Sequence, residues 1–345
     1  MPRALIGLGA SLGDRAATLA SALDGLRAYS TNTPLCSSRF FETAPLGGDG
    51  WQPSYLNAAA VIDTSLPAMD LLRQLQLIEH QHGRVRTAGK VWEPRTLDLD
   101  LLLFDQEILL TPTFTVPHRW LAFRDFALEP AVEIAADWRH PIFGLTLWEL
   151  RNRLRDAAGW LLITGDDDEQ LFYLAISLAF HDVDQSGKEV IVNLPFECEE
   201  LIHTDLVEIN AARSVVKDYQ LKIKAGVPTR RITACLPNSS QLTKYDWFQL
   251  IVTPLGAHLI FPIMRAELPF PTARLCLYKD AEAMDAAYLQ ASCRSRDLPA
   301  ELATWDEKSG DGCVIPTLWI AAEDQDQIIR EAATLWEAIC GSAVT

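Results

Sequence analysis

Residues 97–104 read Leu-Asp-Leu-Asp-Leu-Leu-Leu-Phe, and this alternation is the strongest local constraint on the fold. Successive side chains of a strand point to opposite faces, so Asp98 and Asp100 share one face while Leu99 and Leu101 share the other. The leucine face needs a hydrophobic core, whereas the aspartate face needs water or a cation. We therefore expect a strand whose leucine face points into the core.

The segments before this strand alternate between strand-like and helix-like patterns. Strands are expected at residues 4–9, 37–43 and 55–64. A first helix, capped by Asp14, carries four apolar residues on one face, namely Leu19, Ala22, Leu23 and Leu26. A second helix ends at Gly83 and does the same with Leu71, Leu72, Leu75 and Ile78. These elements predict an α+β domain with helices on a mostly antiparallel sheet, and a ferredoxin-like layout is expected.

The chain has 345 residues, which favours two domains because single cores rarely grow beyond roughly 250 to 300 residues. Residues 164–170 contain a glycine followed by four acidic side chains, a pattern typical of a linker. We expect a first domain at residues 1–163, an acidic linker at 164–170 and a second domain at 171–345. Charge divides similarly, since residues 1–165 carry 15 basic and 18 acidic side chains and the remainder carries 15 and 28.

The second domain reads as an α/β unit. A long helix is expected at residues 199–219, and buried strands at 247–252, 274–278 and 317–321. A final helix repeats apolar residues at helical spacing, namely Ile328, Ile329, Ala332, Trp336 and Ile339. Gly187-Lys188-Glu189 lacks the preceding glycine and the hydroxyl of a phosphate-binding loop, so a working loop of that type is not expected.

Composition narrows the classes of partner. The formal net charge of -16 argues against a general nucleic-acid binder, because phosphate backbones require a basic surface. No apolar run reaches the roughly 18 to 20 residues of a membrane span, and the first residues lack a secretory pattern. The seven cysteines form no close pairs suited to zinc. We expect a cytoplasmic protein that binds small molecules, without nucleic-acid or membrane partners.

The aspartate pair is a candidate metal site. Two neighbouring carboxylates repel each other unless a cation lies between them, and hard oxygen ligands suit Mg²⁺ that carries a nucleotide's phosphates. Asp98 and Asp100 are therefore candidate magnesium ligands. Taken alone, an Asp-Leu-Asp sequence more often marks a solvated strand face than a metal site.

Cationic and aromatic side chains surround this strand in the sequence. Arg84 and Arg86 follow the second predicted helix, and Arg95 precedes the strand. Guanidinium groups match phosphate oxygens, and a loop that carries them can close over a triphosphate, although a solvated basic turn is the alternative. Downstream of the strand lie a histidine, a cation and an aromatic ring, namely His118, Arg124 and Phe126. Upstream of it, the ring of Tyr55 and the amide of Asn57 are suited to a flat heterocycle.

In this order, the segments resemble 6-hydroxymethyl-7,8-dihydropterin pyrophosphokinase over residues 4–160. The resemblance implies a ferredoxin-like α+β fold and transfer of the β,γ-pyrophosphate of ATP to the pterin's hydroxymethyl oxygen, with release of AMP, in folate synthesis. It also implies two Mg²⁺ ions, held by Asp98 and Asp100, with ATP as co-substrate.

The resemblance also implies roles for other residues. Catalytic roles fall on Arg84, Arg95 and His118, and nucleotide contacts on Gln76, Glu79, Arg86, Thr115, His118 and Arg124. The pterin would be bound by Thr43, Ala44, Leu46, Tyr55, Asn57, Trp92 and Phe126. The sequence departs from the family pattern at Ser11, where an asparagine is usual, and at Thr113 and Arg119, where some members carry arginine and tyrosine. These departures bear on nucleotide affinity and local hydrogen bonding.

Two other readings stay open. The chain could be bifunctional, with a nucleoside-kinase-like or other unrecognised activity in the second domain. The end of that domain resembles the end of a nucleoside kinase, which could instead mean a degenerate kinase fold kept for assembly. Motifs of dihydroneopterin aldolase and dihydropteroate synthase are not found in residues 170–345. The chain could also be a non-catalytic protein that binds pterin or nucleotide, but the retained cluster of charges argues against lost catalysis. A protein partner of the acidic second domain is not identified by the sequence.

Overall fold

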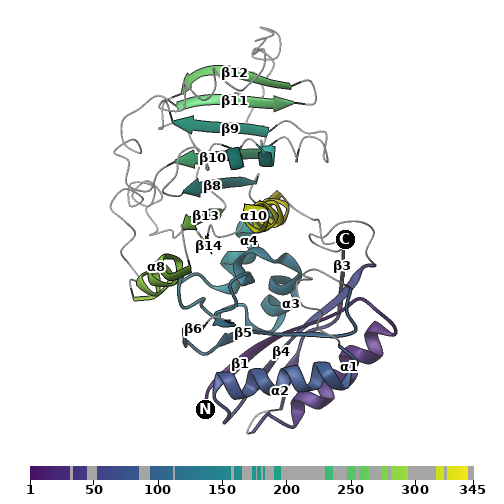
Figure 1. The fold of residues 1–345 in the computed structure, drawn as a ribbon. Helices are drawn as coiled ribbons and strands as arrows, with labels where there is room; N and C mark the ends of the chain where they lie inside the picture. The colour runs from purple at the N-terminus through teal and green to yellow at the C-terminus, as the bar shows by residue number, and fades with distance from the viewer. Residues whose placement is uncertain are drawn as a thin grey trace. The chain divides into compact units, whose positions relative to one another are not determined.

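The structure, a computed structural model, divides into two compact units, Met1–Arg155 and Asp156–Cys340. It describes residues 1–31, 34–44, 53–84, 94–111, 113–156, 159–164, 173–175, 177–179, 182, 190–195, 230–235, 247–253, 256–263, 273–278, 281–293, 316–321 and 325–340. Figure 1 traces both units. Among these residues, no helix is long and apolar enough to cross a membrane.

The first unit is built on an antiparallel sheet in the order β2-β4-β1-β5. Its strands are β1 (Arg3–Ala10), β2 (Cys36–Ser37), β4 (Tyr55–Asp63) and β5 (Asp98–Phe104), and β3 (Phe41–Thr43) also pairs with β4. β1 is therefore central, with β4 on one side and β5 on the other. The expected continuous strand at residues 37–43 is wrong, because the ladder with β4 is interrupted between β2 and β3, where the Ser38 hydroxyl rather than a backbone carbonyl accepts the Ala59 amide at 2.9 Å.

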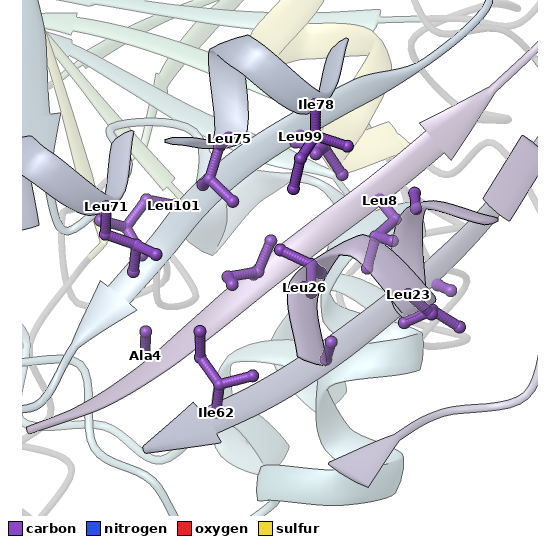
Figure 2. Close-up of a cluster of buried hydrophobic side chains, with 14 of the residues drawn as sticks. Ala4, Leu8, Leu23, Leu26, Ile62, Leu71, Leu75, Ile78, Leu99 and Leu101 are labelled. Atoms are coloured by element: carbon purple, nitrogen blue, oxygen red, sulfur yellow. The ribbon is translucent and has the colours of Figure 1, made fainter. Parts of the chain in front are cut away.

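Two helices, α1 (Arg15–Arg27) and α2 (Ala68–Gln81), cover one face of this sheet (Figure 1). The carboxylate of Asp14 accepts the Ala17 amide at 3.0 Å and caps α1, as the sequence predicts. The core contains the predicted faces of both helices, except that Leu72 is only partly buried. Figure 2 shows Leu23 and Leu26 of α1, and Leu71, Leu75 and Ile78 of α2, directed at the sheet.

β5 carries the predicted alternation. Leu99 and Leu101 are buried in the helix-covered core (Figure 2). Asp98 and Asp100 are partly exposed. Full burial of a leucine side chain stabilises a fold by about 1.5–3 kcal/mol, so the leucines fix which face of β5 points inward. The aspartates are thereby fixed to the opposite face.

The rest of the first unit follows β5. The hairpin of β6 (Leu109–Thr111) and β7 (Phe114–Val116) leads into a 3-10 turn, η1 (Leu121–Phe123), and then into α3 (Asp125–Ala135), which packs against β3 and β4. α4 (Leu147–Asp156) begins with a capping box, in which Glu149 accepts the Thr146 amide and Thr146 accepts the Glu149 amide. These elements position the residues that follow the aspartate strand.

The second unit contains a seven-stranded sheet in the order β12-β11-β9-β10-β8-β13-β14. Five strands are parallel, namely β8 (Trp160–Thr164), β9 (Val190–Pro195), β10 (Arg230–Cys235), β13 (Ala273–Tyr278) and β14 (Thr317–Ala321). β11 (Trp247–Thr253) and β12 (Gly256–Ile263) extend it antiparallel, and α8 (Ala281–Cys293) and α10 (Gln325–Cys340) are the longer helices described. The three predicted strands correspond to β11, β13 and β14.

The position of β8 corrects the predicted domain boundary. The sequence places residues up to 163 in the first domain, yet Trp160–Thr164 pairs with β10 and β13 at the centre of the second sheet. The first unit therefore ends at Arg155. A five-residue apolar strand gives no sign of which sheet it joins, because its partners lie about 70 residues or more further along the chain.

One face prediction in the second unit is also wrong. Ile328, Ala332, Trp336 and Ile339 of α10 are buried as expected, but Ile329 is 40% exposed, because it lies one residue beyond the buried stripe. The expected helix at residues 199–219 and the acidic run at 165–170 lie outside the described residues.

Candidate active site

The polar face of the first sheet brings residues from three strands into one row. Gly9 of β1 pairs with Asn57 of β4 on one side and with Asp98 of β5 on the other. In the neighbouring row, Gly7 pairs with Asp100. Directly paired residues of an antiparallel sheet share a face, so the amide and both carboxylates project from the same side of the sheet. The candidate site is this face.

The two glycines of β1 leave room in these rows. A Cβ at Gly9 would lie 3.1 Å from Oδ1 of Asn57, and a Cβ at Gly7 would lie 3.2 Å from the side chain of Leu102. Both distances are tighter than ordinary van der Waals contact. Gly9 therefore allows the Asn57 carboxamide to lie over the central strand, close to the aspartate row.

Asn57 is held in one orientation. Its Nδ2 donates a hydrogen bond to Oγ1 of Thr43 at 2.7 Å, and both side chains are buried. This contact leaves Oδ1 directed toward Gly9 as an acceptor. Tyr55, the strand partner of Thr43, is partly buried, and Ala44 is exposed at the end of β3. The structure thus brings Thr43, Tyr55 and Asn57 together, as the sequence predicts.

Asp98 is surrounded by arginines. Oδ2 accepts from Nη1 of Arg95 at 2.7 Å, and Oδ1 accepts from Nη1 of Arg84. Burial opposes ionisation of Asp98, but the charges of Arg95 and Arg84 outweigh it and hold the pKa of this carboxyl below its ordinary value. Asp98 is therefore an ionised carboxylate with two cations already in contact.

Ser11 fixes the position of Arg95. The Ser11 amide donates to the Arg95 carbonyl at 3.0 Å, and the Arg95 amide donates to the Ser11 hydroxyl at 3.0 Å. The loop after β1 is thus tied to the residue that precedes the aspartate strand. Sequence reasoning noted Ser11 only as a departure from a family pattern, because nothing local reveals a partner 84 residues away.

Asp100 has a different environment. Among the described residues, Arg124 has Nη1 at 3.8 Å from Oδ2 of Asp100, and Nε2 of His118 lies at 4.0 Å. Burial, followed by the negative charge of Asp98, raises the pKa of Asp100 to about 7, although Arg124 and Arg95 oppose this shift. The two carboxylates therefore repel each other, and Asp100 is the less compensated one.

His118 is a neutral imidazole at this site. Burial, followed by the positive charge of Arg124, lowers the pKa of His118 to about 3. Its Nδ1 accepts the Trp120 amide at 3.3 Å, which places the ring proton on Nε2, facing Asp100. The backbone amide of His118 donates to the Leu102 carbonyl at 2.9 Å, which anchors it beside β5. His118 is thus a hydrogen-bond donor rather than an acid.

Arg124 lies between two rings. Its guanidinium carbon is 5.5 Å from the ring centroid of Trp120 and 5.5 Å from that of Phe126. Cation–π contacts of this kind orient a guanidinium without neutralising it. Phe126 is partly buried, and the structure brings this predicted aromatic residue against Arg124.

The other predicted residues are placed less centrally. Gln76 is exposed on α2, Thr115 is partly buried in β7, and Thr113 and Arg119 are exposed. Glu79 is buried at 2% exposure and contacts Arg84. Leu46, Arg86 and Trp92 lie outside the described residues.

Comparison with known proteins identifies this arrangement. Residues 5–136 match the family profile of 7,8-dihydro-6-hydroxymethylpterin-pyrophosphokinase. The chain is 40% identical over 137 residues to a 2-amino-4-hydroxy-6-hydroxymethyldihydropteridine pyrophosphokinase of Haemophilus influenzae, covering 40% of this chain and 84% of that protein. The enzyme with the same name from Pseudomonas aeruginosa is 38% identical over 139 residues, with the same coverage. The chain belongs to this pyrophosphokinase family.

The match to the family profile, at residues 5–136, lies within the first unit. Among solved structures, an HPPK-DHPS in complex with substrates is similar at 11% identity and a TM-score of 0.36, covering 51% of this chain and 55% of that one. A likeness of this degree carries no conclusion about residues 156–340. The pyrophosphokinase assignment therefore applies to the first unit.

The carboxylate pair fits the magnesium that is typical of this pyrophosphokinase family. The described residues contain no group of three or more His, Cys, Asp or Glu side chains that could enclose a metal by themselves. Mg²⁺ in nucleotide sites is commonly held by one or two carboxylates, with waters and phosphate oxygens completing its shell. Asp98 and Asp100 meet this requirement, and their mutual repulsion favours a cation beside them.

Proposed function

We propose that the first domain transfers the β,γ-pyrophosphate of ATP to the hydroxymethyl oxygen of 6-hydroxymethyl-7,8-dihydropterin and releases AMP. The observation that carries this proposal is the Asp98–Asp100 pair, which shares one sheet face with the Asn57 amide and has Arg84, Arg95 and Arg124 beside it. Family membership supports the same reaction in folate biosynthesis. ATP is the co-substrate.

Asp98 and Asp100 would hold two Mg²⁺ ions together with the phosphates. When bound, these ions supply charge neutralisation and alignment of the triphosphate with the pterin hydroxyl. In the transfer, the hydroxymethyl oxygen forms a bond to the β-phosphorus, the bond from that phosphorus to the bridging oxygen of the α-phosphate breaks with release of AMP, and the hydroxyl proton passes to water. The carboxylates keep the metal-binding face negative.

Three side chains are proposed to stabilise the transferring group. Arg84 and Arg95 bring guanidinium donors to the Asp98 end, where developing negative charge on the pyrophosphate needs them. His118 would donate from Nε2 to a phosphate oxygen, because the lowered pKa keeps the imidazole neutral with Nδ1 occupied by the Trp120 amide. These donors act by position and electrostatics, without accepting the substrate proton.

The pterin would lie at the Asn57 end of the site. Tyr55 and Phe126 would line its flat faces, and Oδ1 of Asn57 would accept from a ring N–H, since Thr43 occupies the Nδ2 side. Ala44 and Leu46 would contribute backbone contacts and Trp92 would close over the ring. Buried amides of fixed orientation give specificity because a mismatched ligand leaves them without a partner.

The nucleotide would extend from the Asp100 end toward α2 and β7. Gln76, Thr115, Arg86 and Arg124 would contact ATP, and Glu79 lies behind Arg84 on the same side of the site. Arg124 is suited to this role because its guanidinium is oriented by two rings and lies beside Asp100, with Nη1 at 3.8 Å from Oδ2.

The strand order β2-β4-β1-β5 with two helices on one face supports a ferredoxin-like assignment for the first domain. For the second domain, β8 with two parallel strands on each side supports an α/β assignment of the doubly wound type. We propose domains at residues 1–155 and 156–340, which revises the boundary expected from the sequence.

The test is AMP release from ATP by the full chain, measured with and without hydroxymethyl-dihydropterin and Mg²⁺. We expect turnover that requires both, and none above background for a variant that combines Asp98→Ala with Asp100→Ala. Asp24→Ala, which removes an exposed carboxylate from α1, serves as the matched control and should retain wild-type turnover. A folded wild-type chain that releases no AMP would contradict the proposal.

A further inference from the structure

Glu79 is a buried carboxylate at the edge of the active site. It belongs to α2, its side chain is 2% exposed, and burying a carboxylate is costly unless it is paired and hydrogen bonded. A residue with so little exposed surface cannot contact a nucleotide without local opening of the fold. Its partners within the protein therefore define its role.

The first partner is the backbone of the aspartate strand. Oε1 of Glu79 accepts the amide of Leu99 at 2.9 Å, and Leu99 lies between Asp98 and Asp100. β5 pairs only with β1 in the described sheet, so its outer edge offers amides that no strand satisfies. Glu79 accepts the Leu99 amide at this edge. Because Leu99 lies between Asp98 and Asp100, this hydrogen bond fixes the directions of both carboxylates.

The second partner is Arg84. Nη1 of Arg84 contacts Oε1 of Glu79 and also Oδ1 of Asp98, and the Arg84 side chain is 13% exposed. The Arg84 amide also donates to the Glu79 carbonyl at 3.1 Å. Arg84 is thus shared between a carboxylate proposed to bind metal and one that is buried behind it.

This sharing has a consequence when a metal binds. Asp98 must give up part of its contact with Arg84 in order to bind a cation, and Arg84 would then turn toward the phosphates. Glu79 would retain its contact with Arg84, because the Leu99 amide holds its carboxylate at the edge of β5. The arginine can change partner without leaving the site.

We propose that Glu79 is a positioning residue that acts through Arg84 and the Leu99 amide, rather than a residue that contacts ATP. The inference rests on the function proposed above. This role replaces the nucleotide contact that the family resemblance implies for Glu79. Removal of the Glu79 charge should therefore slow the transfer step rather than weaken the binding of ATP.

The main variant is Glu79→Gln, which keeps an acceptor for the Leu99 amide and removes the charge that holds Arg84. We expect kcat to fall by roughly 10-fold to 100-fold, the range for residues that orient groups in direct contact with substrate or metal. The Kd of MgATP, measured by calorimetry without pterin, should change by less than about threefold, because no nucleotide contact is lost. Asp70→Asn, the same change at an exposed site on α2, should leave both quantities unaltered.

A double-mutant cycle with Arg84→Ala tests the route of the effect. If Glu79 acts through Arg84, the Glu79→Gln substitution should lower kcat by no more than about twofold in an Arg84→Ala background. The proposal would be overturned if the decreases in kcat of the two single variants multiply in the double variant. It would also be overturned by a wild-type kcat for Glu79→Gln, or by a raised Kd for MgATP with unchanged kcat.

Hydrogen exchange of the Leu99 amide provides a readout that does not depend on catalysis. The amide should be protected in the wild type and in Glu79→Gln, and lose protection in Glu79→Ala. If Glu79→Gln does not fold, Glu79→Asp tests the same point, because its shorter side chain cannot reach both partners and should lower kcat while keeping the charge. If the Leu99 amide is protected in a chain that releases no AMP, the proposed function is refuted but the positioning contact stands. If the Leu99 amide is unprotected in an active chain, the positioning role is refuted.

Discussion

The two ends of the carboxylate pair differ although they lie two residues apart on one strand face. Asp98 is in contact with Arg84 and Arg95, which keep the pKa of its carboxyl low despite burial. Asp100 has Arg124 at 3.8 Å and a neutral His118 at 4.0 Å, and burial together with Asp98 raises its pKa to about 7. One carboxylate is compensated by the protein, and the other is left for a ligand to compensate.

The difference teaches how a site can be stable without its metal and still attract one. Two ionised carboxylates without cations would oppose folding, whereas two fully paired carboxylates would give a metal little advantage. The protein neutralises one end with side chains that can later bind phosphate. At the other end, a bound cation would favour ionisation of Asp100, which couples metal binding to proton release.

The largest expected effect concerns the carboxylates themselves. We expect Asp98→Asn and Asp100→Asn each to lower kcat on the order of 10²–10³-fold, comparable to the loss of one preorganised electrostatic group. AMP release at saturating Mg²⁺ measures this effect. If one of the two variants kept more than a tenth of wild-type turnover, that carboxylate would not be a metal ligand and the pair would not act as a unit.

The next effect separates the cations at the two ends. Arg95→Ala should lower kcat, because Arg95 contacts Asp98 next to the transferring group. Arg124→Ala should chiefly raise the KM for ATP, by roughly 10-fold to 100-fold, the value of a hydrogen bond to a charged group. Steady-state kinetics with each substrate varied in turn distinguishes the two results. Identical changes for both arginines would remove the proposed division between the ends.

A smaller effect is the pH dependence of stability without metal. Because the pKa of Asp100 in the folded state is raised to about 7 from about 3.9 in an unfolded chain, its stabilising contribution is present below about pH 4 and is lost as the pH rises through about 7. In EDTA, the Tm of wild type relative to Asp100→Asn should therefore fall over this range. The expected change is a few degrees, and saturating Mg²⁺ should reduce it. A constant Tm difference would contradict the raised pKa.

The Tm of wild type must be compared with the Tm of Asp100→Asn, because other groups change the stability in the opposite direction as the pH rises. His140 is buried, its Nδ1 accepts the amides of Ile142 and Phe143, and burial lowers its pKa to about 3. Its contribution to stability is complete above about pH 6.5 and is lost as the pH falls toward 3. It is present in both proteins and cancels.

The smallest expected effect compares the two glycines of β1. Gly9→Ala should press on Oδ1 of Asn57 and raise the KM for the pterin a few-fold, with little change for ATP. Gly7→Ala, in the row of Asp100, meets Leu102 instead and should lower Tm without a selective effect on the pterin. Overpacking of this kind typically costs about 1–3 kcal/mol. A pterin KM that changes equally in both variants would show that the Asn57 end is not the pterin end.

Much of the first domain could be predicted from the sequence because its signals are local. The alternation around Asp98, the capping aspartate of α1 and the apolar stripe of α2 each lie within one element, and each matches the structure. The residues gathered at the site were also found, since most flank these elements directly.

The pairing of charges could not be predicted in the same way. Which arginine contacts Asp98, and which is left near Asp100, depends on side chains brought together by the sheet and by long-range bonds such as Ser11 to Arg95. The burial of Glu79 is likewise set by the docking of α2 on β5. Neither fact has a periodic signature, so the members of the site could be predicted without their partners.

The place of β8 has a practical consequence for dissecting the chain. A fragment that stopped within the acidic run would retain Trp160–Thr164 but lack the strands that flank it in the second sheet. Five consecutive residues of high β-propensity without partners form an edge that can pair with other chains, so such a fragment should aggregate for reasons unrelated to its catalytic site. Truncations intended to isolate the pyrophosphokinase should end before residue 157, and poor behaviour of longer ones would report an orphaned strand rather than interdependence of the two domains.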